Sequence, residues 1–74
     1  MRTFPVILEW DSADSVWVSH VPSLDYLSTY GETREGVLEN TREAILGYLE
    51  AADKEGRAIP PPSRAELVDI EVAV

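Results

Sequence analysis

The chain has 74 residues, fourteen acidic and six basic side chains, and a formal net charge of −8 at pH 7. This length predicts a single domain, 1–74, near the lower limit at which one apolar core holds a fold. The excess of carboxylates opposes direct binding of nucleic acid, which needs lysine and arginine against the phosphate backbone. We therefore expect no direct contact with DNA or RNA.

The sequence contains no cysteine and a single histidine, His20. Neither a disulfide nor a structural zinc site can support so small a core, and we expect no cofactor. Oligomerisation is the remaining common source of stability, so we expect a homo-oligomer. No apolar run approaches the roughly 18 to 20 residues that span a bilayer, and no signal-peptide pattern is present. These observations predict a cytoplasmic protein that does not bind membranes.

Two strands are predicted at the start of the chain. Apolar residues alternate from Phe4 to Trp10, the period of a β-strand. The polar segment 11–14 predicts a turn, and the segment Val16–Val21 is rich in β-branched residues. The two strands should therefore form a hairpin that ends at Pro22.

A third strand and one long helix should follow. Leu27–Tyr30 is a short strand candidate closed by Gly31, and Thr33 is a suitable N-cap for a helix that begins at Arg34 and stops before Gly56. At 100° per residue, one apolar stripe on this helix is wide enough to cover a sheet. The stripe contains Val37, Leu38, Thr41, Ala44, Ile45, Tyr48, Leu49 and Ala52.

The C-terminal part predicts an extended connector and a last strand. Prolines in 58–64 bias the chain away from helix, and 67–74 alternates with Val68, Ile70, Val72 and Val74 on one side. The predicted fold class is α+β in the order β-β-β-α-β. It consists of an antiparallel sheet of three to four strands with one helix on one face.

Carboxylates form a ridge along the predicted helix. They lie within about 80° of one another by the helical period, with Leu46 among them and roughly opposite the apolar stripe. Like charges four residues apart repel, so a sequence that served helix stability alone would interleave lysines. We interpret the ridge as a partner-binding surface, with an ordinary solvated face as the alternative. Its residues are Glu35, Glu39, Glu43, Leu46 and Glu50.

The sheet carries more apolar surface than one helix can cover. Ile7 lies opposite the face of Phe4, and Trp17 lies opposite Val16 and Val18, so both should belong to the second sheet face. We predict an oligomer interface there, with the incompletely buried surface of a small protein as the alternative.

Enzymatic chemistry has weak support in the sequence. Glu9, Asp11 and Asp25 lie near predicted strand ends, and paired carboxylates can hold Mg²⁺ for phosphodiester cleavage. Their spacing matches no known motif, and Asp11 is explained as a turn residue. We expect no catalytic residue, no bound metal and no enzyme activity, and keep a small metal-dependent nuclease as the less favoured alternative.

Several short motifs together resemble the N-terminal domain of the HicB-like antitoxins. They are Val21-Pro22-Ser23-Leu24, Gly31-Glu32-Thr33, the segment 39–45, Tyr48-Leu49-Glu50 and Ile59-Pro60-Pro61-Pro62, in the family's order. The family usually has Gly-Cys after the Pro-x-Leu loop, where this chain has Tyr26-Leu27.

The resemblance implies a pared-down RNase H-like fold. It also implies a protein that binds and neutralises a small basic HicA-type toxin, an enzyme that cleaves RNA. A free-standing oligomeric scaffold without a toxin partner is the alternative from a different class.

Overall fold

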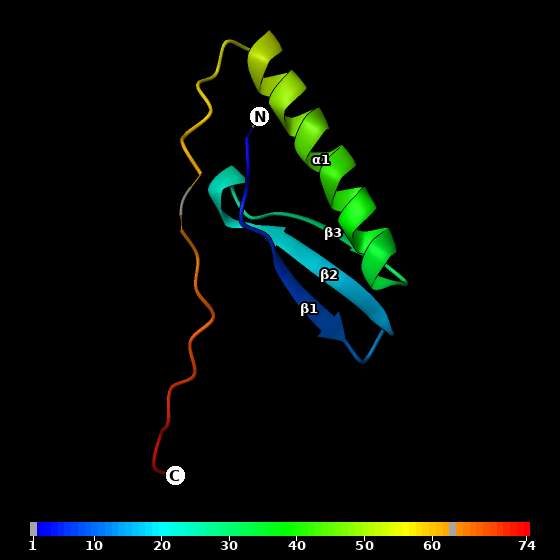
Figure 1. Cartoon of the computed structure of the whole chain (residues 1–74), viewed down its shortest axis with the longest axis vertical. Coiled ribbons are helices and arrows are strands. Elements are labelled where there is room, and N and C mark those ends of the chain that lie inside the picture. Colours follow the sequence, from blue (N-terminus) through cyan, green and yellow to red (C-terminus); the bar gives the residue numbers. More distant parts are fainter. Residues whose placement is uncertain (1, 63) are drawn as a thin grey trace.

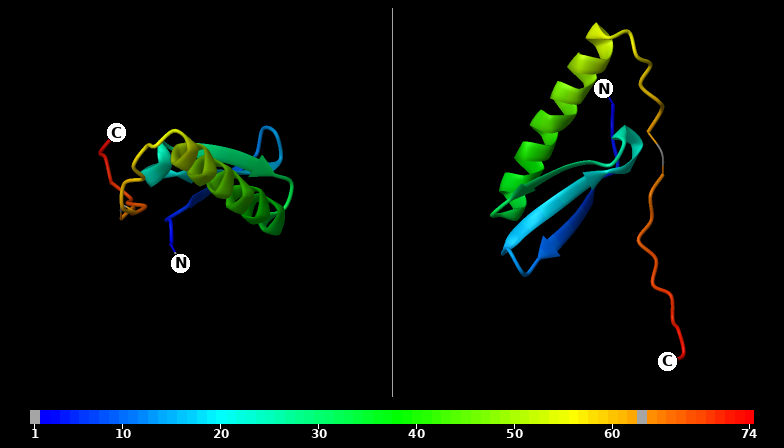
Figure 2. Two further views of the ribbon diagram at one scale, coloured as in Figure 1. Left: turned by 90° about the horizontal axis from the view of Figure 1, so that it is seen from above. Right: turned by 180° about the vertical axis from the view of Figure 1, so that it is seen from behind.

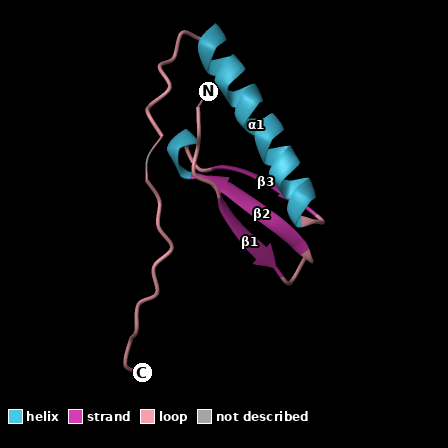
Figure 3. Cartoon of the chain, in the orientation of Figure 1, coloured by secondary structure: helices cyan, strands magenta, loops and turns pink. Residues whose placement is uncertain are grey.

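The computed structural model describes residues 2–62 and 64–74. Their helices and strands are β1 (Ile7–Asp11), β2 (Val16–Val21), the 3-10 helix η1 (Pro22–Leu24), β3 (Leu27–Gly31) and α1 (Arg34–Lys54) (Figure 1). The strands form one antiparallel sheet in the order β1-β2-β3, and α1 lies across one of its faces (Figure 3). The predicted α+β class, the hairpin and the order β-β-β-α are confirmed.

The hairpin between β1 and β2 is closed by a side chain. Asp11 Oδ1 accepts hydrogen bonds from the backbone N–H groups of Ala13 at 3.0 Å and Asp14 at 3.2 Å. This Asx-type arrangement is the turn chemistry that the sequence predicts. The first strand starts at Ile7 instead of Phe4, because Pro5 has no N–H to offer to a ladder.

The core lies between α1 and the sheet. Its fully buried apolar side chains come from β2, η1 and α1, and they are Val21, Leu24, Val37 and Ala52. The helix packs mainly over β3 and β2, as the view from above indicates (Figure 2). The helix-facing side of β1 therefore remains partly uncovered, and Trp10 at its end is 50% exposed.

Both ends of α1 are capped as predicted. Thr33 Oγ1 accepts a hydrogen bond from the backbone N–H of Gly36 at 2.9 Å, which satisfies one of the free donors of the first turn. At the other end Gly56 has φ of +68°, and the N–H of Arg57 donates to the carbonyl of Ala52 at 2.8 Å. The second pattern is a Schellman motif, and it fixes where the chain leaves the helix.

The predicted fourth strand is wrong for this single chain. Leu67–Val74 is extended but belongs to no sheet, and its apolar side chains are exposed. A strand needs the free edge of a neighbour, and the chain after α1 runs apart from the sheet in two opposite views (Figures 1 and 2). The radius of gyration is accordingly 14.4 Å, against about 11 Å for a compact chain of this length.

The predicted connector, 58–64, contains residue 63, which lies outside the described residues. The remainder, 58–62 and 64, forms neither helix nor strand, as expected for a segment with three consecutive prolines.

Candidate functional site

The acidic ridge lies on the side of α1 that faces away from the sheet. All five of its residues are exposed, and Leu46 has an exposed fraction of 58%. They occupy successive turns of one helix, so the structure brings them together on one surface as the sequence predicts. The ridge consists of Glu35, Glu39, Glu43, Leu46 and Glu50.

Contacts on the opposite side of α1 fix this orientation. Thr41 is 3% exposed, and its Oγ1 lies 2.7 Å from Ser19 Oγ on β2. On the β3 side, Asn40 Nδ2 donates a hydrogen bond to the backbone carbonyl of Tyr30 at 2.9 Å. The helix is thereby held against two strands, and rotation that would turn the ridge inward would break both bonds.

Glycine at position 31 allows the start of α1 to approach the sheet closely. A Cβ built on Gly31 would lie 2.6 Å from the backbone nitrogen of Val37 and 2.9 Å from its Cα. No larger residue fits at that distance without a backbone shift. The first turns of the helix, which carry Glu35 and Glu39, depend on this contact for their position.

A groove of about 580 Å³ separates α1 from the segment that leads into β1. The strand side contributes Phe4 and Val6, and the helix side contributes apolar residues of the predicted stripe together with Leu46. Two exposed basic side chains, Arg2 and Arg42, also line it. Leu46 therefore lies on the border between the acidic ridge and this groove, whereas the sequence places it simply at the centre of the ridge.

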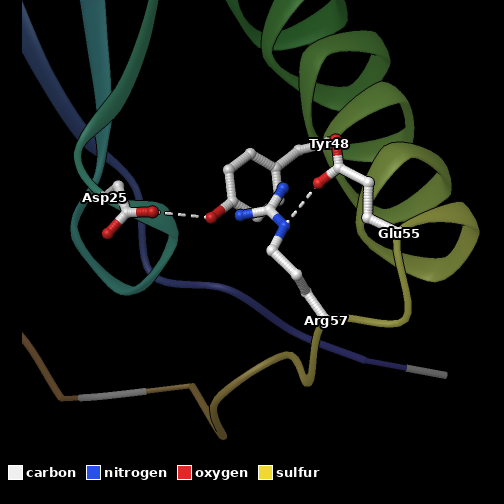
Figure 4. Close-up of polar contacts among 4 residues, drawn as sticks. All are labelled: Asp25, Tyr48, Glu55 and Arg57. Atoms are coloured by element: carbon white, nitrogen blue, oxygen red, sulfur yellow. Dashed lines mark hydrogen bonds and ion pairs between the residues drawn. The ribbon is translucent and has the colours of Figure 1, made fainter.

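A polar cluster joins the C-terminal half of α1 to the loop after η1 (Figure 4). The Tyr48 hydroxyl donates a hydrogen bond to Asp25 Oδ2 at 2.7 Å. The guanidinium of Arg57 lies 5.5 Å from the centre of the Tyr48 ring, and its Nε donates to Glu55 Oε2 at 2.7 Å. This arrangement attaches the Pro-Ser-Leu-Asp loop to the helix, and the sequence does not predict it because the helical period places position 48 only in the apolar stripe.

The same cluster changes two pKa values. The hydrogen bond to Asp25, with smaller contributions from desolvation and from the charge of that carboxylate, raises the pKa of Tyr48, and Arg57 opposes the increase. The hydrogen bond and charge of Glu55 raise the pKa of Arg57, with Tyr48 adding to the effect. Tyr48 is thus held as a protonated hydrogen-bond donor.

The carboxylates of the alternative nuclease hypothesis lie in separate environments. Asp11 closes the hairpin turn, Asp25 accepts from Tyr48 at the other end of β2, and Glu9 Oε1 lies 3.0 Å from His20 Nε2. Across 2–62 and 64–74 we find no group of three or more histidine, aspartate or glutamate side chains close enough to hold a metal ion. The structure does not bring these three carboxylates together.

A protein of an established family is similar to this chain over most of its length. The chain is 34% identical over 64 residues to the UPF0150 protein Ta0767 of Thermoplasma acidophilum, and the match covers 86% of this chain and 91% of that protein. The chain belongs to the UPF0150 family. No family model matches this UPF0150 chain, and no solved structure matches it significantly.

The predicted oligomer-interface residues of this UPF0150 chain lie on different faces of the sheet. Ile7 pairs with His20, whereas Trp17 pairs with Trp10 and Gly31. Because side chains alternate along a strand, Ile7 is on the open face and Trp17 is on the helix side, where its ring meets Trp10 edge to face at 5.4 Å. An interface on the open face would include Ile7 and leave out Trp17.

We find no helix in the described parts of this UPF0150 protein with the length and apolar character needed to cross a bilayer.

Proposed function

We propose that this protein is a HicB-like antitoxin that binds and neutralises a small basic toxin that cleaves RNA. Family membership supports the proposal, because UPF0150 is a HicB-like family. The chain's net charge of −8 also suits a basic partner, since opposite fields accelerate encounter.

The acidic ridge is the observation that carries the proposal. It combines four exposed carboxylates with one exposed leucine on a helix whose other side is held by the sheet. An apolar residue with a charged rim is a common arrangement in protein interfaces. In this proposal Leu46 contacts the toxin directly, and Glu35, Glu39, Glu43 and Glu50 pair with its basic surface. Inhibition results from covering the toxin and needs no catalysis by this chain.

A co-expression experiment tests the proposal. Any small basic protein that is found to be encoded beside this gene is expressed alone and together with the chain, and growth is recorded. We expect growth arrest with the candidate toxin alone and rescue by the native chain. Failure of the native chain to rescue would contradict the proposal.

Charge reversal on the ridge tests the surface itself. Glu39→Lys combined with Glu43→Lys should weaken rescue and raise the dissociation constant about 10-fold, mainly through a slower and less salt-dependent association. The matched control is Asp14→Lys with Ser12→Lys and Ala13→Lys, which makes the same change in net charge at exposed positions of the hairpin turn, outside both α1 and the C-terminal segment. Equal weakening by the ridge variant and the control would show a general charge effect and no role for the ridge.

A further inference from the structure

The segment 64–74, here called the tail, is extended and forms no helix or strand. No backbone hydrogen bond forms within its described residues or between them and the rest of the chain. Its alternation nevertheless places three apolar side chains on one side, and Ile70 among them is 80% exposed. Exposed strands with this pattern add to sheet edges. The three residues are Val68, Ile70 and Val72.

The same chain contains a sheet edge that could accept such a strand. β1 is hydrogen-bonded only to β2, so its outer edge is free. A strand added there would lie about 4.8 Å beyond β1 and would send alternate side chains to the helix side of the sheet. The groove lies beside the start of β1, where Phe4 and Val6 of the preceding segment line it together with apolar residues of α1. The groove therefore offers apolar contacts to those inward side chains of an added strand that extend past the start of β1.

Charge favours the tail as the occupant of this groove. The described part of the tail carries Arg64 with Glu66, Asp69 and Glu71, and its net charge is −2 from one basic and three acidic groups. The groove is lined by Arg2 and Arg42, which form no ion pair among residues 2–62 and 64–74. By the period of two, Glu66 shares the inward side with Val68 and Ile70, whereas Asp69 and Glu71 point outward, so Glu66 is the acidic side chain that can reach these guanidinium groups.

We propose that two copies of the chain exchange tails, each tail adding as a fourth strand to β1 of the other copy. The three consecutive prolines before the tail favour a stiff extended connector, and in the structure the tail lies apart from its own sheet (Figure 1). A two-fold exchange fills the groove and pairs the free β1 edge of each copy, and it leaves neither tail without a partner. Exchange also supplies the added burial that a core of this size lacks.

Sedimentation of the full chain with two matched tail variants tests the exchange. The native chain should sediment as twice its mass of 8.2 kDa. Ile70→Asp places a carboxylate on the inward side and should raise the dimer dissociation constant at least roughly 100-fold. Ala73→Asp adds the same charge on the outward side and should change it less than about 5-fold. Both positions are exposed in the single chain, so neither substitution should alter the circular dichroism of the folded domain.

A labelling experiment distinguishes exchange from other uses of the tail. Because the chain has no cysteine, Ala73→Cys gives a single site for a spin label, and labelled protein is mixed with ¹⁵N-enriched native chain. Broadening of the native amides of β1 and of Leu38, Ile45 and Leu49 would support exchange. A monomer at all concentrations, equal effects of the two aspartates, or broadening only when label and ¹⁵N are on the same chain would overturn the proposal. The last result would mean that each tail occupies its own groove.

Discussion

The hydrogen bond between Thr41 and Ser19 is the buried polar link between α1 and β2, and its removal should measurably destabilise the fold. Thr41 Oγ1 lies 2.7 Å from Ser19 Oγ and 2.6 Å from the carbonyl oxygen of Val37. A carbonyl can only accept and a hydroxyl has one proton, so Thr41 donates to Val37 and Ser19 donates to Thr41. The remaining contact of Ser19 Oγ, to the carbonyl of Thr29, is long at 3.5 Å.

The substitution Thr41→Val keeps the shape of the side chain and removes only its hydroxyl. Ser19 is fully buried, so its hydroxyl would then lack a good acceptor, which costs about 1–3 kcal/mol. Threonine and valine have similar helix propensities, and the Val37 carbonyl keeps its helical partner. We expect a loss of about 1.5 kcal/mol from a total of roughly 4–11 kcal/mol for 74 residues. The melting temperature should fall by about 6–12 °C.

A double-mutant cycle, with each variant unfolded in urea, measures the coupling between the hydroxyl groups of Thr41 and Ser19. Ser19→Ala alone should cost about 1 kcal/mol, and the double variant should cost less than the sum of the single variants by about 1 kcal/mol, because the second substitution removes a group that the first left unpaired. If the two losses add to within about 0.3 kcal/mol, the hydroxyl groups are not coupled and the reasoning fails.

Three other predictions concern glycines and the tyrosine cluster. Gly31→Ala should lower the free energy of unfolding, measured in urea, by about 1–3 kcal/mol, because the added Cβ would lie 2.6 Å from the backbone nitrogen of Val37. An unchanged free energy of unfolding would contradict that close approach. Gly47→Ala should stabilise by about 0.5–1 kcal/mol, because Gly47 is an exposed helix residue with nothing within 4 Å of an added Cβ, and a loss of stability would count against it. The hydrogen bond to Asp25 raises the pKa of Tyr48. The stability that this bond contributes should therefore be complete below about pH 10 and should disappear as the pH rises through the higher pKa of Tyr48 in the folded state. The stability difference between native chain and Tyr48→Phe should therefore shrink above pH 10, and a constant difference would refute the assignment.

Local signals predicted most of the fold. Period-two alternation and the polar turn at 11–14 identified the hairpin, and Thr33 and Gly56 marked the two ends of α1. These features act over a few residues, so a single sequence contains them. The five residues of the acidic ridge were found in the same way, since the helical period alone places them on one side.

Features that depend on long-range pairing were not predictable in the same way. The alternation in 67–74 showed that the segment could be a strand, but pairing depends on an edge that no local pattern identifies. The assignment of Ile7 and Trp17 to one face failed for a related reason, since only the register that pairs Trp17 with Trp10 settles which face each side chain takes. The contact between Tyr48 and Asp25 joins positions 23 residues apart, and it likewise has no local signature.

The proposed toxin surface and the proposed tail exchange occupy adjoining sides of α1. The carboxylates of the ridge do not line the groove, whereas Leu38, Ile45 and Leu49 do. An exchanged dimer would therefore leave both ridges open for toxin. Leu46 lines the groove as well as the ridge, so a substitution there would affect both processes. Charge reversal at Glu39 and Glu43 changes only the ridge, and Ile70→Asp changes only the tail, so the two proposals can fail independently.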